Sequence, residues 1–341
     1  MRRPTIKDIA REAGVSVATV NRVIAGNVPV REETGRRVSE AAQRIGYHAT
    51  NLINQKLTAD LPLVRFGFML HNEDQPFYRA LADRLIEAVD RLDGVRGTAV
   101  VKFARSQAPA DFGDALLEAG EDADVVAATA LNHHRVNDAV RQLAERKVKT
   151  FAIMSDFAQG ERESYIGLNN LKVGRGAAWL LSATARKPGR LAIFVGGHRW
   201  HGHDLREAGF RSFFREHLPR FEVLDTLVNL ETPLLTYEAT LDLLSRYPDV
   251  VGIYVAGGGM DGAIKALREE RKPGEVALVV NQFTSASRRG LADGYVTSVV
   301  GTPTQPLCSE LVQLMAKTVR GEPVSGQYFL EPVVHIPELG E

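Results

Sequence analysis

Hydrophobic positions follow two different patterns along this chain of 341 residues. In roughly the first fifty residues, apolar side chains recur every three or four positions over short stretches, which is the period of amphipathic helices. From residue 63 onward, short apolar runs alternate with amphipathic segments. The runs cover residues 64–70, 98–104, 124–130, 149–155, 165–168, 190–196, 250–256 and 276–282. This alternation predicts βαβ units, with parallel sheets covered by helices on both faces.

The N-terminal residues predict three short helices. Thr5 and Asp8 form a capping-box pattern that begins the first helix, and Gly14 is placed to end it. Ser16 is placed to cap a second helix, and a third is expected near residues 32–45. A four-residue turn between the first two helices completes the pattern of a helix-turn-helix unit.

The second helix presents four outward positions, Val17, Ala18, Asn21 and Arg22. These side chains suit base edges, since Asn can pair with adenine, Arg with guanine or phosphate, and small apolar groups with the thymine methyl. A solvated face would more often carry Lys and Glu. The alternative is a small helical bundle with an incidental polar face. We expect this helix to enter a DNA major groove.

Charge adds to this picture. The whole chain has 42 basic and 42 acidic residues, yet residues 1–57 hold ten Lys/Arg against five Asp/Glu. The remainder therefore holds 32 basic and 37 acidic residues. A basic segment before a mildly acidic body indicates an anionic partner for that segment alone. The length favours two or three domains, and 44% hydrophobic and 25% charged residues are typical of soluble globular proteins.

Several classes of protein are disfavoured by composition. Cys308 is the one cysteine, so no disulfide framework or cysteine metal cluster is expected. The basic N-terminus lacks the apolar region of a secretory signal. No apolar run is long enough to span a membrane, so we expect a cytoplasmic protein without membrane contact.

Residues 5–26, TIKDIAREAGVSVATVNRVIAG, resemble the head of the LacI/GalR family of bacterial transcription regulators in order, spacing and N-terminal position. Asn21 and Arg31 stand where that family usually has serines. The resemblance implies that Val17 and Ala18 read bases, with Arg22 beside them. It assigns positioning contacts to the DNA backbone to Thr5, Ser16, Thr19 and Asn21.

The resemblance also implies a helix-turn-helix domain over residues 1–47, followed by a hinge helix and linker over residues 48–62. In the family, a leucine of the hinge helix wedges into the minor groove. Here Ala49 replaces the usual Pro, and Leu57 comes one residue later than the usual Leu. The hinge residues expected to contact DNA are Asn51 and Leu57, with Leu52 or Ile53 packing between two hinges.

Residues 63–341 resemble the periplasmic-binding-protein-like effector domain of the same family. The implied fold is an α/β domain of two lobes, each with a doubly wound parallel sheet. Lobe 1 would comprise about 63–158 and 285–300, and lobe 2 about 163–280 and 306–330. The three expected crossing segments lie near Phe157–Ser164, Asn281–Ser285 and Gly301–Gln305.

A ligand cleft is expected where the carboxyl ends of the strands of both lobes face each other. Arg206, in an R-x-x-G-F pattern, stands where the family places an arginine that grips the effector. Trp200 could stack on a sugar ring, and Asp204 could accept hydroxyl protons. The other expected cleft residues are His71, Asn72, Phe77, Tyr78, Asn132, His133, Ser155, Asp156, Asp261, Asn281 and Gln282. Each of them can instead be a satisfied loop or core group.

Gly257, Gly259 and Gly262 match the G-x-G-x-x-G spacing of dinucleotide-binding turns. The turn, however, lies far from any first βαβ unit, and the strand after its helix ends in VVNQF without an acid for a ribose hydroxyl. We therefore interpret it as a ligand turn, with Asp261 facing the cleft or capping the helix, and expect no cofactor.

His198, His201 and His203 raise the possibility of a metal site, but their spacing matches neither a helical pair nor a zinc finger. We expect no metal there. The chain also lacks a nucleophile elbow, a P-loop and an H-E-x-x-H motif, and offers no candidate catalytic residues.

The sequence thus predicts a regulator that binds a near-palindromic operator as a homodimer, with a tetramer as the alternative. The favoured role is a repressor of a carbohydrate-utilisation operon that responds to a sugar or polyol. A nucleobase, nucleoside or sugar-phosphate effector is the alternative within this architecture. A sugar-active or NAD-dependent enzyme is less favoured, and a transport protein would need an export signal and no basic head.

Overall fold

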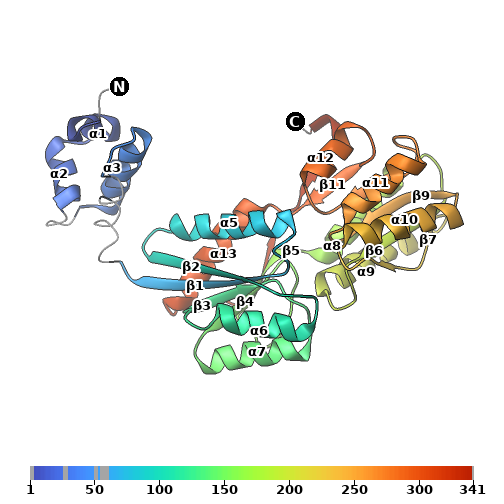
Figure 1. The fold of residues 1–341 in the computed structure, drawn as a ribbon, viewed down its shortest axis with the longest axis horizontal. Helices are drawn as coiled ribbons and strands as arrows, with labels where there is room; N and C mark the ends of the chain where they lie inside the picture. The colour runs from blue at the N-terminus through green and yellow to red at the C-terminus, as the bar shows by residue number, and fades with distance from the viewer. Residues whose placement is uncertain (1–3, 26–29, 50–52, 54–60, 340–341) are drawn as a thin grey trace. The chain divides into compact units, whose positions relative to one another are not determined.

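The computed structural model describes residues 4–25, 30–49, 53 and 61–339 (Figure 1). The chain forms two compact units, one of residues 1–64 with 92–97 and one of residues 65–91 with 98–341. We refer to the three N-terminal helices as the head and to the α/β part as the body, and describe each by itself.

The head contains the three expected helices, α1 (Ile6–Ala13), α2 (Val17–Ala25) and α3 (Glu32–Arg44). The Thr5 amide and hydroxyl both donate to Oδ2 of Asp8, over 2.9 and 2.7 Å. Gly14 ends α1 in the left-handed region at φ 62°. The first helix therefore begins and ends where local capping chemistry places it.

The apolar faces of these helices form one core. Its buried members are Ile9, Ala10, Ala13, Val20, Val23, Val38, Ala41, Ala42 and Ile53. Ile53 is fully buried in this head core, whereas the expectation that Leu52 or Ile53 packs between two hinges concerns a pair of chains and stays a prediction. Asn51, Leu52 and Leu57, the other hinge residues singled out by the sequence, lie outside the described residues.

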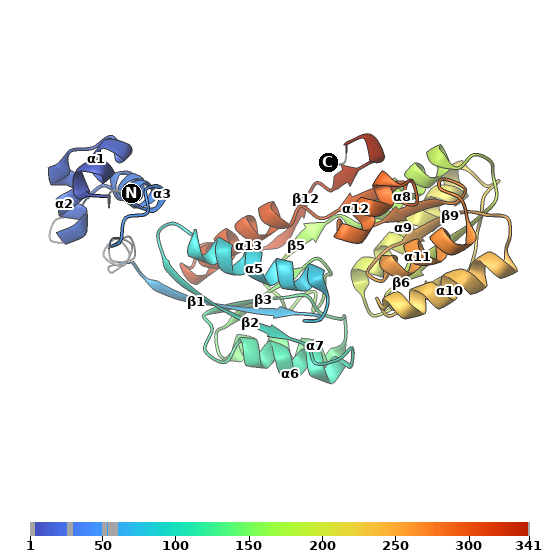
Figure 2. The same cartoon turned by 45° about the horizontal axis from the view of Figure 1, so that its top comes forward.

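Lobe 1 of the body has a six-stranded sheet in the order β12-β5-β4-β3-β1-β2. Its strands are β1 (Leu63–Leu70), β2 (Arg96–Phe103), β3 (Val125–Ala128), β4 (Lys149–Ile153), β5 (Ser164–Leu168) and β12 (Gly326–Leu330). Helices α5 (Pro76–Asp90) and α13 (Thr304–Val319) cover one face, and α6 (Pro109–Ala119) and α7 (His134–Glu145) cover the other (Figures 1 and 2). Because β3, β4 and β5 lie between these layers, they are almost entirely buried and read as apolar runs.

Lobe 2 has a seven-stranded sheet in the order β13-β11-β10-β9-β6-β7, with β8 also paired to β6. Its strands are β6 (Arg190–Val195), β7 (Glu222–Val223), β8 (Leu227–Val228), β9 (Val250–Val255), β10 (Ala277–Val280), β11 (Ser298–Gly301) and β13 (Val333–His335). The helices are α8 (Asn170–Thr184) and α9 (His201–His217), which pack together, and α10 (Pro233–Arg246), α11 (Met260–Glu270) and α12 (Ser285–Ala292). A short 3-10 turn covers Pro337–Leu339. Among the described helices, none has the length and apolar character needed to cross a lipid bilayer.

The expected two-lobed, doubly wound α/β fold is confirmed, but the expected lobe boundaries are wrong at three places. Residues 163–168 belong to lobe 1, because β5 pairs with β4. Residues 285–300 belong to lobe 2, because β11 pairs with β10, and residues 306–330 belong to lobe 1, because α13 packs on α5 and β12 pairs with β5. Strand pairing depends on hydrogen bonds between segments far apart in sequence, and the apolar pattern does not specify them.

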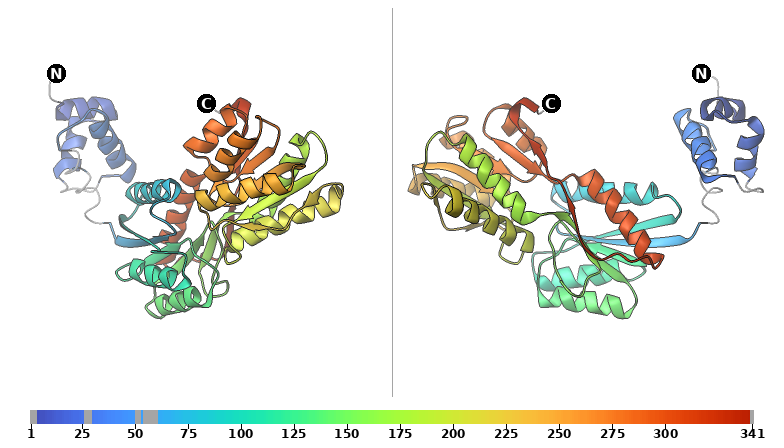
Figure 3. Two further views of the ribbon diagram at one scale, coloured as in Figure 1. Left: turned by 45° about the vertical axis from the view of Figure 1, so that its right-hand side comes forward. Right: turned by 180° about the vertical axis from the view of Figure 1, so that it is seen from behind.

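The chain consequently crosses between the lobes at residues 168–170, 301–304 and 330–333. The expected crossing near Gly301–Gln305 is confirmed, whereas those near Phe157–Ser164 and Asn281–Ser285 lie within one lobe each. The view from behind in Figure 3 shows strand β12, drawn red, running beside β5.

Both sheets share one topological feature that positions the site. The strand order reverses between β1 and β3 in lobe 1 and between β6 and β9 in lobe 2. In open α/β sheets, ligands bind beyond the carboxyl ends of the strands at such a reversal. The residues that follow β1, β3, β6 and β9 are therefore in the position to form a ligand site.

Candidate functional site

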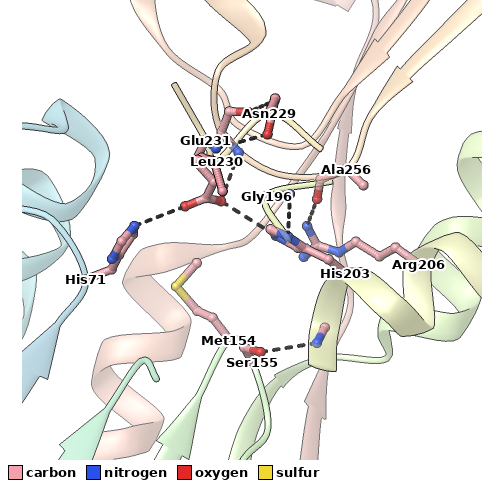
Figure 4. A network of polar contacts seen from close by, with 12 residues as sticks. His71, Met154, Ser155, Gly196, His203, Arg206, Asn229, Leu230, Glu231 and Ala256 are labelled. Atoms are coloured by element: carbon pink, nitrogen blue, oxygen red, sulfur yellow. Dashed lines mark hydrogen bonds and ion pairs between the residues drawn. The ribbon is translucent and has the colours of Figure 1, made fainter. Parts of the chain in front are cut away.

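Residues that follow strands at both order reversals meet in a buried polar cluster (Figure 4). His71 follows β1, and Gly196 and Gly257 follow β6 and β9. His203 and Arg206 lie in the first turns of α9, and Glu231 lies in the loop between β8 and α10. These side chains are at most 8% exposed.

A small cavity of about 40 Å³ lies within this cluster. Several polar atoms beside it are buried and have no hydrogen-bond partner within the part of the chain that the structure describes. They are Thr129 Oγ1, Trp200 Nε1, Glu231 Oε2 and Asn281 Oδ1, together with both ring nitrogens of His71 nearby. Since buried polar groups are nearly always paired, a concentration of unpaired donors and acceptors at one place indicates a site for a polar ligand.

A larger cleft of about 1350 Å³ adjoins the small cavity. Lobe 1 contributes Asn72 and Phe77 to its lining, and lobe 2 contributes Asp261, Asn281 and Gln282. Phe77, Asn281 and Gln282 also line the small cavity, so the two spaces share part of their walls. The polar cluster therefore borders a cleft that is large enough for a small ligand.

Glu231 is the central charge of the cluster. Its Oε1 accepts a hydrogen bond from the Gly258 amide over 3.0 Å and lies 3.6 Å from Nε2 of His203. Its Oε2 lies 3.6 Å from Nε2 of His71 (Figure 4). One carboxylate from lobe 2 is thus held between a histidine of its own lobe and a histidine of lobe 1.

Burial favours the neutral form of both histidines. Burial lowers the pKa of His203 to about 4, although the Glu231 charge opposes the shift. Burial likewise lowers the pKa of His71, again against Glu231. Nδ1 of His203 accepts from the Gly196 amide over 3.0 Å, so its proton sits on Nε2, directed toward Glu231.

Arg206 lines the small cavity, but it already has two protein partners. Its Nε donates to Oδ1 of Asn170 over 2.7 Å, and its Nη1 donates to the Ala256 carbonyl over 2.5 Å. These bonds fix the guanidinium plane beside the cavity. The position expected from the sequence is therefore supported, and the group is oriented before any ligand enters.

Trp200 lies in the cluster, but its ring is used differently from the expected stacking on a sugar. The ring packs edgewise against His71 and Phe112, with centroids 5.1 and 5.7 Å away. It is 3% exposed and lines the small cavity with its unpaired Nε1. What it offers a ligand is therefore an N–H donor rather than an open aromatic face.

Four expected cleft residues, Asp204 among them, line neither the cleft nor the cavity. Asn132 and His133 line neither the cleft nor the cavity as described, and His133 Nδ1 instead accepts from the Arg135 amide at the start of α7. Asp156 forms a buried ion pair with Arg162. These predictions failed for one reason. The end of a strand places a residue at the expected edge of a sheet, but the turn that follows decides where its side chain points.

Asp156 illustrates this point. Arg162 donates to both of its carboxylate oxygens over 2.5 and 2.8 Å, and Gln159 and Gln327 donate to Oδ2. Burial alone would raise the pKa of Asp156, but the bonds and charge of Arg162 lower it overall. All of its acceptor capacity serves the junction of β4, β5 and β12.

Glu231 and Thr129 are site residues that the sequence reading missed. Glu231 follows β8, which has only two residues and therefore shows no periodic strand signal. Thr129 directly follows β3, as the expected cleft residues follow their strands, and this position could have identified it.

The histidine-rich loop does not gather into a metal site. His203 is buried beside Glu231, whereas His198 lies on the exposed side, 3.9 Å from Asp204. Burial raises the pKa of Asp204. Within residues 4–25, 30–49, 53 and 61–339, no group of three or more His, Cys, Asp or Glu side chains is arranged to hold a metal ion.

In the head, α2 exposes the positions expected to face DNA. Val17, Ala18, Asn21 and Arg22 are exposed, while Val20 and Val23 are buried in the head core. Ser16 Oγ accepts from the Thr19 amide over 3.1 Å, and Thr19 Oγ1 lies 3.4 Å from Nη2 of Arg22. The outward face of α2 thus carries two small apolar side chains, one amide and one guanidinium.

Comparison with known proteins agrees with both parts of this description. Residues 5–50 match the family described as bacterial regulatory proteins, lacI family, and residues 66–323 match the periplasmic binding protein domain. The transcriptional regulator CelR of Thermobifida fusca is 27% identical over 333 residues, which cover 94% of this chain and 93% of CelR. The regulator GntR of Pseudomonas aeruginosa is 25% identical over 295 residues, covering 81% and 79% of the two chains.

Solved structures share the fold of the body. A solute-binding protein from Agrobacterium vitis with bound α-D-tagatopyranose has a TM-score of 0.74 at 16% identity, covering 81% of this chain and 95% of that one. A periplasmic solute-binding protein from Actinobacillus succinogenes with D-allose has the same TM-score at 15% identity, covering 81% and 99%. With its helix-turn-helix head and its periplasmic-binding-protein body, this chain belongs to the lacI family and is a transcriptional regulator, not an enzyme.

Proposed function

We propose that this regulator is a repressor of carbohydrate-utilisation genes and that a neutral sugar or polyol bound in the cleft controls it. The observation that carries the proposal is the set of buried, unpaired donors and acceptors around the small cavity. A polyhydroxylated ligand can pair donors and acceptors at the same time, because each hydroxyl does both. Sugars bound to proteins of the same fold support this ligand class.

The charges of the site favour a neutral ligand over a sugar phosphate. The amide of the glycine turn, which could receive a phosphate oxygen, already binds the carboxylate of Glu231. Arg206 is engaged by Asn170 and Ala256. A phosphate placed beside Glu231 would meet a buried negative charge, because the basic residues Arg84, Lys265, Arg268 and Arg289 line the larger cleft and not the small cavity.

On the DNA side, we propose that a homodimer binds a near-palindromic operator through two copies of α2. Its half-sites would lie about one DNA turn, roughly 34 Å, apart. Effector binding would change lobe closure and so operator affinity. A coupling free energy of about 1–3 kcal/mol corresponds to a change of roughly 5–150-fold.

A thermal-shift screen tests the effector class, with aldoses, polyols, hexose phosphates and nucleobases in parallel. We expect stabilisation by one or more neutral sugars or polyols, and a change of operator affinity in a gel shift with the same compound. If only hexose phosphates or only nucleobases stabilised the protein, the effector would belong to that class and not to the sugars and polyols.

A matched pair of tryptophan variants tests the site. Trp200→Phe removes the unpaired N–H donor and keeps an aromatic ring, so effector affinity should fall about 5- to 10-fold for one lost hydrogen bond. Trp179→Phe is the control, because Trp179 is 57% exposed on α8 and lines neither the cleft nor the cavity as described. Equal affinities for both variants would contradict the proposed place of the ligand.

A further inference from the structure

The loop of residues Asn229–Thr232, which we call the tongue, has an unusual backbone. Leu230 and Glu231 are consecutive non-glycine residues in the left-handed region, at φ 49° and 55°. This region is unfavourable for residues with a Cβ, and two such residues in succession persist only where surrounding contacts hold them.

Lobe 2 holds the base of the tongue. Oδ1 of Asn229 accepts from the Glu231 amide over 2.9 Å, and Nδ2 of Asn229 donates to the Gly258 carbonyl over 2.9 Å. The Gly258 amide in turn binds the carboxylate of Glu231. The tongue and the glycine turn are therefore tied together by backbone and side chain.

Lobe 1 holds the tip of the tongue from three separate elements. Nε2 of Gln107, in the loop between β2 and α6, donates to the Leu230 carbonyl over 2.7 Å. Nε2 of Gln75, before α5, donates to the Glu231 carbonyl over 3.4 Å. His71, after β1, lies 3.6 Å from the Glu231 carboxylate. Contacts across the cleft thus converge on two consecutive residues.

We propose that the tongue is a latch that closes the two lobes on each other without an effector, with Glu231 standing in for effector hydroxyls between His71 and His203. Glu231 Oε2 and both nitrogens of His71 lack hydrogen-bond partners in the described structure, so the latch leaves their capacity unused. An effector that donates to Glu231 and pairs with His71 would replace a weak contact with hydrogen bonds. The response of the latch to an effector rests on the proposed function, whereas the closure of the two lobes by the latch does not.

The backbone of the tongue makes the latch reversible. Opening the lobes would break the contacts of Gln107, Gln75 and His71. Glu231 would keep its bonds to Asn229 and Gly258, whereas Leu230 would lose its bond to lobe 1 and its left-handed backbone could relax. The strain therefore opposes the latch contacts and brings the closed and open states nearer in free energy. Two kinds of substitution should consequently move the equilibrium in opposite directions.

Spin-label distances measure this equilibrium without effector or DNA. Asp114→Cys on α6 and Glu238→Cys on α10 place labels on exposed positions of the two lobes. Cys308, the one native cysteine, is 1% exposed and should stay unlabelled. Dilution with unlabelled protein removes distances between chains. We expect one predominant short distance for the otherwise unchanged protein.

Gln107→Ala combined with Gln75→Ala, and separately Glu231→Ala, which removes the carboxylate beside His71, should raise the long-distance fraction several-fold. Leu230→Gly should lower it, because glycine adopts the left-handed conformation without strain and the leucine side chain is largely exposed. Gln313→Ala, an exposed glutamine on α13, is the matched control and should leave the distribution unchanged.

An open distribution in the unchanged protein, or identical distributions for the control and both opening variants, would overturn the latch. A failure of the proposed function looks different. If the latch variants open the lobes but no sugar or polyol stabilises the protein, the latch stands and the proposed effector class falls.

Discussion

The backbone amide of Gly258 donates a hydrogen bond to the Glu231 carboxylate over 3.0 Å. The glycine turn that resembles a dinucleotide-binding motif thus binds an anion, but the anion is a side chain of the same lobe. A Cβ on Gly257 would lie 2.8 Å from Oε1 of Glu231, and Gly259 has φ 88°. The glycine spacing is explained by room for an internal carboxylate and by a left-handed turn before α11.

Gly262, the last glycine of that motif, has a different role. A Cβ there would lie 1.9 Å from the Pro233 carbonyl, so α10 and α11 can pack this closely only without a side chain. Gly262→Ala should therefore force the helices apart and lower the free energy of unfolding by about 2–3 kcal/mol, measured by urea titration. Gly176→Ala is the control, because no described atom lies within 4 Å of its added Cβ on exposed α8, and it should be neutral or stabilising. Equal effects would contradict the packing explanation.

Arg22 is the guanidinium on the exposed face of α2. Arg22→Ala should weaken operator binding by about 1–3 kcal/mol, or roughly 5–150-fold, measured by fluorescence anisotropy at physiological salt. Arg44→Ala removes the same charge from α3, where Arg44 pairs with Glu12, and should have a much smaller effect. Unchanged affinity for Arg22→Ala would place the recognition surface elsewhere on the head.

His203 should make stability depend on pH. The unfolded chain takes up its proton near pH 6.5, whereas the buried ring does so only near pH 4, so stability falls as pH decreases between these values. The loss should reach about 2 kcal/mol between pH 6.5 and 5. His203→Gln should flatten this part of the curve in urea unfolding, while His217→Gln, at an exposed histidine, should keep the slope. Because burial also lowers the pKa of His71, part of the slope should remain, and only an undiminished slope in His203→Gln would contradict the assignment to His203.

Asp156 and Arg162 form a buried ion pair, with side chains 4% and 8% exposed. Asp156→Ala leaves the guanidinium buried without its partner and should destabilise the body by about 3–5 kcal/mol. Asp242→Ala, which breaks an exposed pair with Arg246, should leave the melting temperature nearly unchanged. If Asp156→Ala instead removed effector binding at unchanged stability, the carboxylate would belong to the ligand site as the sequence reading first placed it.

The site was only partly predictable from the sequence. Arg206, Asn281 and Gln282 line the small cavity as expected, because a position at a strand end or in a family pattern is a local property. Asn132, His133 and Asp156 satisfied the same local rule and are used elsewhere. Glu231 satisfied no such rule, since its place depends on Asn229, Gly258 and the contacts of lobe 1.

By itself, the sequence determined the helical head, the alternation of strands and helices in the body and the two-lobed class. Capping between Thr5 and Asp8 and the apolar run of a buried strand each involve only a few consecutive residues, so the local sequence pattern predicts them. Only the tertiary structure decided that β5 and β12 join lobe 1, that β11 joins lobe 2 and that Glu231 stands between His71 and His203. Strand partners and buried polar contacts join residues far apart in the chain, and their energies are settled only when the whole fold brings those residues together.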